Sequence, residues 1–213
     1  MIELQVGGPG LTRIVLASNN AKKLAELTRV FAAERLPITV LSLADVPPYP
    51  EPDETESSFE GNAVIKARAA AEASGQVSVA DDSGLEVDVL NNMPGVRSAR
   101  WAGPGSSDDE NLDLLLRQLA DVTDERRTAR FVCALALVTP DGTERVWRAT
   151  MEGRLIAHRR GDNGFGYDPI FVPEGYDVTS AELDPAAKDA ISHRGKAIRL
   201  MVADLRHLLG GTP

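Results

Sequence analysis

The sequence has little of what several common kinds of functional site require. It contains one cysteine, Cys133, and only three histidines among 213 residues. One thiol excludes an internal disulfide framework, and Cys133 lies in the apolar run 131–135, which predicts a buried structural thiol and not a nucleophile. No apolar run has the length of a membrane span, and residues 1–10 lack a basic segment followed by an apolar one. We therefore expect a cytoplasmic protein that does not associate with membranes.

The chain also lacks an excess of positive charge. Its 23 Lys and Arg residues against 32 Asp and Glu residues give a formal net charge of −9. Proteins that bind nucleic acids usually present a basic face, so we expect no nucleic-acid partner. A free nucleotide is compatible with this charge, because it needs only a few cations near its phosphates.

The apolar periodicity predicts an α/β fold with parallel and antiparallel pairing in one sheet and flanking helices. A capping box of Ser57 and Glu60 begins the second helix, and Pro140-Asp141-Gly142 predicts a hairpin turn. The expected strands span residues 13–17, 38–41, 77–80, 85–90, 130–138 and 144–151, and the expected helices 20–33, 57–75, 109–119 and 195–209.

A polar block, 18–23, joins the first strand to the first helix. With Asn20 as N-cap, Lys22 and Lys23 fall in the first helical turn, where positive charge opposes the helix dipole. An anion bound there would turn this penalty into an attraction, with backbone N–H groups contributing. The alternative is that both lysines extend into water.

A second block, Asp81-Asp82-Ser83-Gly84, follows the strand 77–80. Adjacent strand residues point to opposite faces, so one carboxylate should face a site while the other supports the turn. Mg²⁺ usually takes only one or two protein carboxylates, and an acid of the proline-rich loop 45–56 is a candidate for the second. Asn62 and Lys66 share a helix face, from which Lys66 could contact phosphate, and the alternative is a surface lysine with its ammonium group in water. An ordinary acidic turn remains the alternative.

Two further blocks combine glycine with aromatic or cationic residues. In 161–169, glycines surround Phe165, which offers a ring face for stacking on a base. The alternative is a glycine-rich loop with an apolar anchor. Near the last helix, Lys188, His193 and Arg194 provide donors, with Arg194 able to donate in a planar fork.

In this order, the blocks closely resemble the inosine triphosphate pyrophosphatase family, whose members remove non-standard purine nucleotides. The resemblance runs from Arg13 nearly to the C-terminus, so we expect an N-terminal extension, 1–11, and a single two-lobed domain, 12–210. The matching strings are 16–23, 59–68, 80–85, Ser98-Ala99-Arg100, 165–169 and 191–195.

The resemblance implies an elongated mixed sheet with two lobes around a central nucleotide cleft, a homodimer and a Mg²⁺ cofactor. It also implies hydrolysis of ITP, dITP and XTP to the monophosphate and pyrophosphate. The family usually has Thr-Gly-Asn in the first block, where this chain has Ser18-Asn19-Asn20. Serine retains the hydroxyl, and asparagine tolerates left-handed backbone better than most residues.

The resemblance also assigns roles to individual residues. Asp82 matches a general base that is also a metal ligand, Glu54 a second metal ligand, and Ser83 a substrate contact. The remaining substrate-binding positions are Ser18, Asn19, Asn20, Ala21, Lys22 and Lys23 for the triphosphate, and Phe165, Gly166, Tyr167, Asp168, Lys188, His193 and Arg194 for the base.

Two other functions remain open at this point. A Maf-like pyrophosphatase would act on pyrimidine or modified nucleotides, but the strings 165–169 and 192–195 weigh against it. A non-hydrolytic nucleotide-binding sensor would have little use for a base beside a metal, so Asp82 and Glu54 favour hydrolysis.

Overall fold

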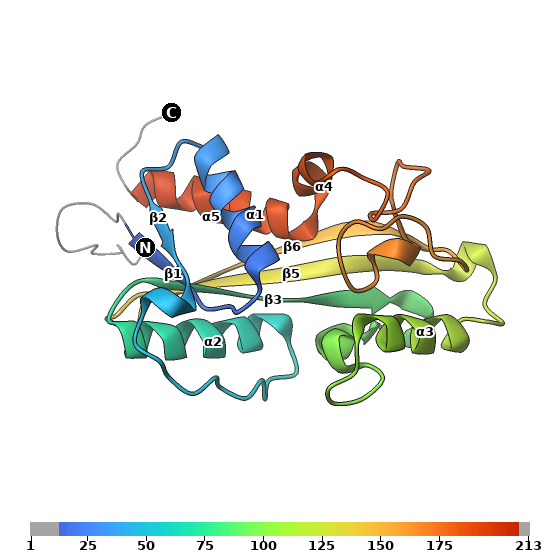
Figure 1. Cartoon of the computed structure of the whole chain (residues 1–213), viewed down its shortest axis with the longest axis horizontal. Coiled ribbons are helices and arrows are strands. Elements are labelled where there is room, and N and C mark those ends of the chain that lie inside the picture. Colours follow the sequence, from blue (N-terminus) through green and yellow to red (C-terminus); the bar gives the residue numbers. More distant parts are fainter. Residues whose placement is uncertain (1–12, 209–213) are drawn as a thin grey trace. The chain divides into compact units, whose positions relative to one another are not determined.

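The computed structural model describes residues 13–208 (Figure 1). The predicted N-terminal extension, 1–11, and the predicted domain end at 210 lie outside the described residues. The chain divides into two compact units. Unit 1 comprises the chain up to Asp82, Ala134–Arg148 and the chain from Gly195 onward, and unit 2 comprises Ser83–Cys133 and Ala149–Arg194.

One mixed sheet contains the strands, in the order β2-β1-β3-β5-β6-β7, with β4 paired to β3. Strand β1 pairs in parallel with β2 and β3, whereas β3–β4 and β6–β7 are antiparallel. The predicted α/β class with mixed pairing is therefore confirmed. The strands are β1 (Arg13–Leu16), β2 (Thr39–Leu41), β3 (Ser78–Val87), β4 (Met93–Pro94), β5 (Thr128–Val138), β6 (Glu144–Leu155) and β7 (Phe171–Pro173).

Unit 1 has helices on both sides of its strands. Helix α2 (Phe59–Ser74) lies on one side, and α1 (Ala21–Ala33) and α5 (His193–Leu208), which enters unit 1 at Gly195, lie on the other (Figure 1). Helix α1 buries Leu27, Val30 and Phe31. Helix α2 instead buries mostly alanines, which allow a helix to approach its neighbours closely: Ala63, Ala67, Ala70 and Ala71. A short 3₁₀ segment, Leu43–Asp45, follows β2.

Unit 2 packs α3 (Asp108–Gln118) against its strands through an apolar core. It also contains α4 (Pro185–Ile191) and the 3₁₀ segments Asp88–Leu90, Gly95–Arg100, Asp124–Arg126 and Asp168–Ile170. Its large buried side chains are Leu85, Val87, Leu112, Leu115, Leu119, Phe131, Met151, Leu155, Tyr167, Ile170 and Phe171.

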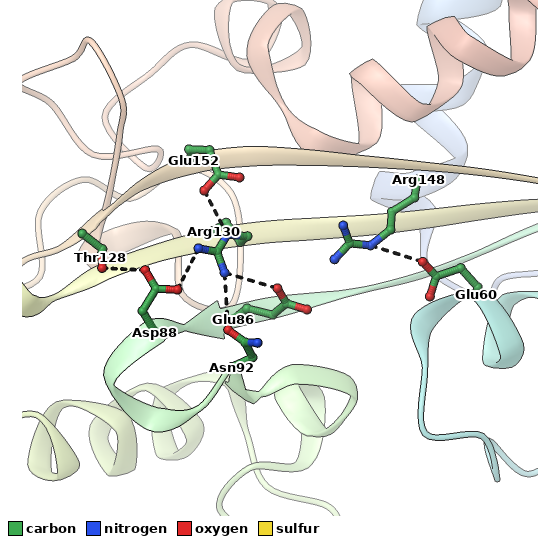
Figure 2. Close-up of polar contacts among 8 residues, drawn as sticks. All are labelled: Glu60, Glu86, Asp88, Asn92, Thr128, Arg130, Arg148 and Glu152. Atoms are coloured by element: carbon green, nitrogen blue, oxygen red, sulfur yellow. Dashed lines mark hydrogen bonds and ion pairs between the residues drawn. The ribbon is translucent and has the colours of Figure 1, made fainter.

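Arg130 of β5 joins three neighbouring segments of unit 2 (Figure 2). Its Nε donates to Glu152 of β6 at 2.9 Å, and its Nη2 donates to Asp88 at 2.7 Å. Asp88 also accepts from the Thr128 hydroxyl at 2.6 Å. The Thr128 hydrogen bond, followed by that of Arg130, outweighs partial burial and lowers the pKa of Asp88.

Two ion pairs join α2 to β6 within unit 1. Arg148 Nε lies 3.2 Å from Glu60 Oε1 (Figure 2), and Arg68 Nη2 lies 2.7 Å from Glu144 Oε1. Both pairs are largely exposed, so each contributes at most about 1 kcal/mol to stability.

Three predicted local features are wrong. Ser58, not Ser57, caps α2: it has extended backbone, and its hydroxyl accepts from the Gly61 N–H at 3.1 Å. Strand β3 continues through residues 81–84, which the sequence predicted as a turn. The carboxylates of Asp81 and Asp82 have separate polar partners, so neither residue has to leave the strand.

The third wrong feature lies before the last helix. The sequence predicted no helix around Lys188, but α4 is there, capped by Asp184, which accepts from the N–H groups of Ala186 and Ala187. Helix α5 then begins at His193, two residues earlier than predicted. His193 and Arg194 are therefore in the first turn of a helix.

Candidate active site

The segment between β1 and α1 is held by its own side chains. The Asn20 N–H donates to Ser18 Oγ at 3.2 Å, and Asn20 Oδ1 accepts from the N–H groups of Lys22 and Lys23 at 2.9 and 3.4 Å. Asn20 is thus the N-cap, as predicted. Because its side chain occupies two first-turn N–H groups, positive charge at this helix end comes chiefly from the lysine ammonium groups.

Lys23 connects this segment to β3. Its Nζ lies 2.9 Å from Asp81 Oδ1, in an ion-pair geometry and not in that of a directed hydrogen bond, and Asp81 is only 3% exposed. Asp81 therefore has a partner on α1, whereas the adjacent Asp82 has its partners on α2. This confirms that the two neighbouring carboxylates point to different surroundings.

Asp82 lies at the centre of a polar cluster with Glu54, Asn62 and Lys66. Lys66 Nζ donates to Glu54 Oε1 at 2.8 Å and to Asp82 Oδ1 at 3.3 Å. The second Asp82 oxygen accepts from Asn62 Nδ2 at 3.2 Å. Asn62 and Lys66 are one turn apart and share a face of α2, as their spacing predicted. The sequence did not predict that both reach Asp82, and the Lys66 side chain is mostly buried and is not a surface lysine.

Burial and charge act in opposite directions on this cluster. Burial raises the pKa of Asp82, and the nearby Glu54 charge adds to it, which together outweigh the lowering by Lys66 and Asn62. Burial alone would lower the pKa of Lys66, but Asp82 and Glu54 more than reverse this and raise it. Asp82 is therefore a stronger base than an ordinary aspartate, beside a lysine that stays positively charged.

The donor set of the cluster fits a hard divalent cation. Asp82 and Glu54 each place a carboxylate oxygen within 3.3 Å of Lys66 Nζ, so the ammonium group occupies the point where these oxygens converge, and the two acids are close enough to share a cation. Within residues 13–208, no three His, Cys, Asp or Glu side chains gather to form a metal cage. Two carboxylates with the other positions left to water and phosphate is the arrangement typical of Mg²⁺.

In unit 2, the loop containing Phe165 is built around the carboxylate of Asp168. Asp168 Oδ2 accepts from the Phe165 N–H at 2.9 Å and from Lys188 Nζ at 2.5 Å. The Phe165 ring is 37% exposed, with Lys188 Nζ 5.6 Å and Arg194 Cζ 5.8 Å from its centroid. Two cations thus lie near one exposed aromatic face, in the range of cation–π interactions.

Tyr167 and Asp168 are mostly buried, unlike their neighbour Phe165. The Tyr167 hydroxyl donates to the Ser98 carbonyl oxygen at 2.8 Å. Burial, with a smaller contribution from the charge of Asp108, raises the pKa of Tyr167, so its hydroxyl remains a donor. Within residues 165–168, Phe165 and the partly exposed Gly166 are therefore accessible, whereas the buried Tyr167 holds the segment through its bond to Ser98.

His193 and Arg194 lie at the start of α5, both less than a tenth exposed. The His193 ring stacks on Phe131, with centroids 5.0 Å apart and planes inclined by 12°. Ser83, also predicted as a substrate contact, follows Asp82 in β3 and is partly exposed. Most of the predicted residues thus form a cluster of lysines and acids in unit 1 and an aromatic and cationic cluster in unit 2.

Two residues next to the second cluster were not predicted as part of it. Ser98 belongs to a string that the sequence analysis noted without a role, and its hydroxyl accepts from the Leu85 N–H at 2.8 Å. Asp108 accepts from the Gly166 N–H at 2.8 Å across 58 residues of sequence. The string containing Ser98 was a usable signal, whereas no local pattern indicates the Asp108 contact.

Comparisons with known proteins agree on one family. A protein of Cutibacterium acnes named dITP/XTP pyrophosphatase is 58% identical over 94% of this chain and 100% of its own length. One with the same name from Streptomyces coelicolor is 52% identical over 94% of this chain and 100% of its own.

Two solved structures match the fold. A HAM1 protein from Coxiella burnetii has a TM-score of 0.83 and 40% identity over 92% of this chain and 99% of its own. The nucleoside-triphosphatase / dITP/XTP pyrophosphatase of Mycobacterium abscessus has a TM-score of 0.75 and 53% identity over 92% of this chain and 100% of its own. With the Ham1 family model also matching residues 14–204, this chain belongs to the Ham1 family.

Proposed function

We propose that the protein hydrolyses the non-standard purine nucleotides ITP, dITP and XTP to the monophosphate and pyrophosphate, which removes them from the nucleotide pool. Full-length relatives named dITP/XTP pyrophosphatase, at 52–58% identity, support this reaction. The observation with most weight is the Asp82 cluster, where a buried carboxylate lies beside Glu54 and shares Lys66 with it. A protein that only binds nucleotides does not require such a base.

In the proposed reaction, Asp82 accepts a proton from the attacking water. The water oxygen forms a bond to the α-phosphorus, and the bond from that phosphorus to the α–β bridging oxygen breaks. Pyrophosphate leaves with the bridging oxygen, and the monophosphate takes up the water oxygen.

The cofactor in this proposal is Mg²⁺, held by Asp82 and Glu54. When bound, it neutralises charge on the phosphate chain. Lys66 and Asn62 orient the Asp82 carboxylate through their hydrogen bonds. Residues 18–23 bind the triphosphate, and Lys22 and Lys23 stabilise the negative charge that develops on the leaving pyrophosphate.

The base is bound by the unit 2 cluster. A purine stacks on Phe165, while Ser83, Lys188, His193 and Arg194 provide polar contacts. Hypoxanthine and xanthine present an oxygen at position six, where adenine presents an amino group. Donors at this position pair with the oxygen but are left facing another donor when adenine is bound, which disfavours ATP.

A homodimer in the cytoplasm completes the proposal. The dimer follows from the family resemblance, and the cytoplasm is where the nucleoside triphosphate pool is used. None of the helices described between residues 13 and 208 is long and apolar enough to cross a membrane.

The first test is pyrophosphate release, measured separately from orthophosphate release, from ITP, XTP, GTP, ATP and TTP with and without Mg²⁺. We expect Mg²⁺-dependent pyrophosphate from ITP and XTP well above the other nucleotides. Preference for TTP would favour the Maf-like alternative. Saturable nucleotide binding without turnover would favour the sensor.

The second test assigns the acids by removing one charge at a time. Asp82→Asn and Glu54→Gln are nearly isosteric and should each lose most turnover while the fold is retained. Asp53→Asn is a matched control, because Asp53 is the exposed acid next to Glu54 in the same loop. Near-normal turnover in Asp82→Asn would refute its role as general base.

A further inference from the structure

Three of the hydrogen bonds that hold the loop presenting Phe165 are made by Phe165, Gly166 and Tyr167. Asp168 accepts from the Phe165 N–H and the Tyr167 hydroxyl donates to Ser98, as described above. The third bond runs from the Gly166 N–H to Asp108 Oδ2, at 2.8 Å. This third bond links the backbone of the exposed part of the loop to a side chain at the start of α3.

Asp108 is itself well placed to fix a neighbouring backbone. It is the first residue of α3, directly after the N-cap Ser107, which forms a reciprocal capping box with Glu110. Arg159, which precedes the loop, pairs with Asp109 and, at 2.7 Å, with Asp113 of the same helix. The start of α3 is therefore anchored, and it contacts the chain both before and within the loop.

The Gly166 backbone has conformational freedom that this bond must restrict. Gly166 has a φ of +60°, and a β-carbon added there would meet no atom within 4 Å. Gly164 also has a positive φ, so the residues on both sides of Phe165 are flexible glycines. Without an acceptor for the Gly166 N–H, the direction of the Phe165 ring is less defined.

We propose that Asp108 is a positioning residue for base recognition: its carboxylate holds Gly166 so that the Phe165 ring faces the base in a single orientation. This rests on the proposed function, in which Phe165 stacks on the purine. Because Asp108 acts on residues that bind the base, its loss changes the Michaelis constant and the preference among bases. It leaves proton transfer at Asp82 unchanged.

Three substitutions separate the hydrogen bond from the charge. Asp108→Asn retains an acceptor oxygen at the same reach without the charge. Asp108→Glu retains the charge but moves the acceptor by one methylene, and Asp108→Ala removes both. Asp121→Ala is the control, since Asp121 is another exposed acid of the same unit.

The measurements are KM and kcat for ITP and ATP, with the affinity for IMP from calorimetry as a readout that needs no turnover. We expect Asp108→Ala and Asp108→Glu to raise KM for ITP and weaken IMP binding by roughly three- to ten-fold, the effect of losing one ordinary hydrogen bond at a partly exposed site. The preference for ITP over ATP should fall, kcat should remain within about two-fold, and Asp108→Asn and Asp121→Ala should behave like wild type.

The opposite pattern would overturn the proposal. If Asp108→Glu behaved like wild type and Asp108→Asn did not, the charge at the helix start would be the important feature and not the bond to Gly166. Wild-type KM, IMP affinity and base preference in Asp108→Ala would refute the positioning role outright. Failure of the wild-type protein to release pyrophosphate from ITP would instead refute the proposed function, so the two failures are distinguishable.

Discussion

Gly164 offers a sharp test of how tightly the Phe165 loop is built. Its φ is +80°, and a β-carbon there would lie 2.1 Å from Asp168 Oδ2 and 3.0 Å from Lys188 Nζ. Real β-carbons essentially never come within 3.0 Å of another heavy atom, so Gly164→Ala must displace the Asp168 carboxylate. That carboxylate is buried and bonded to both Lys188 and the Phe165 N–H, so its displacement breaks or distorts both contacts.

The size of the effect follows from two contributions. An alanine in left-handed backbone costs about 1–2 kcal/mol relative to glycine. Distorting the charged contacts of Asp168 adds about 2–3 kcal/mol, the usual value for a hydrogen bond to a charged group in a mostly buried position. We therefore expect Gly164→Ala to lower the free energy of unfolding by about 3–5 kcal/mol.

Gly105→Ala is a matched control for the backbone contribution alone. Gly105 also belongs to unit 2, has a φ of +76°, and has no atom within 4 Å of an added β-carbon. It should lose only about 1–2 kcal/mol. For a chain of this length each kcal/mol shifts the melting temperature by about 2–4 °C, so calorimetry should separate the two variants by several degrees.

The same pair of variants should separate in function. Gly164→Ala should also raise KM for ITP, whereas Gly105→Ala should not, because only Gly164 contacts the residues proposed to bind the base. Equal losses of melting temperature in the two variants would show that the Asp168 carboxylate yields without cost. The account of the loop as a rigid support for Phe165 would then be refuted.

Three further substitutions test other parts of the structure. Thr128→Val removes the largest cause of the lowered Asp88 pKa. Because a lowered folded-state pKa stabilises the protein above the unfolded-state value of 3.8, urea denaturation should show that the free energy of unfolding falls by about 1 kcal/mol or less near pH 6, and this loss should disappear as the pH falls below 3.8. An equal loss at both pH values would contradict this. Lys66→Met leaves Asp82 and Glu54 without their shared cation, so the pKa of Asp82 should rise further. The low-pH limb of the rate profile should then move to higher pH, and turnover should fall by roughly a hundred-fold. A low-pH limb that does not move would argue against Asp82 as the base. Tyr167→Phe leaves the buried Ser98 carbonyl without this donor and should cost about 1–3 kcal/mol in thermal unfolding, and an unchanged melting temperature would show that water replaces the hydroxyl.

Features that depend on neighbouring residues were predictable from the sequence. The strand at Arg13, the helix that Asn20 caps and the end of α2 at Gly75 follow from apolar periodicity, capping chemistry and the left-handed backbone that glycine adopts readily. The choice between Ser57 and Ser58 as N-cap was not decided by these rules. In the structure it is Ser58 that has extended backbone and accepts from the Gly61 N–H.

Features that depend on distant residues were not predictable. Asp, Ser and Gly disfavour strands, so residues 81–84 indicated a turn. In the structure the strand continues, because Lys23 and Lys66, from two different helices, compensate its two carboxylates. The contacts of Ser98 with Tyr167 and of Asp108 with Gly166 span 69 and 58 residues, beyond any local pattern.

The different surroundings of Asp81 and Asp82 in β3 depend on strand register. Val15 pairs with Ser78 and Leu16 with Val79, which fixes β3 beside the strand that leads into α1. With this register, Asp81 meets Lys23 of α1, and Asp82 meets Lys66 of α2. A shift of β3 by one residue would exchange the faces of the two acids, because side chains alternate along a strand. A shift that moved Asp82 into the place of Asp81 would pair it with Lys23 of α1 and bring Ser83, which has no carboxylate, beside Glu54. Backbone pairing therefore decides which of the two adjacent aspartates contacts α1 and which contacts α2. Their side chains are chemically identical, so residue type alone could not predict it.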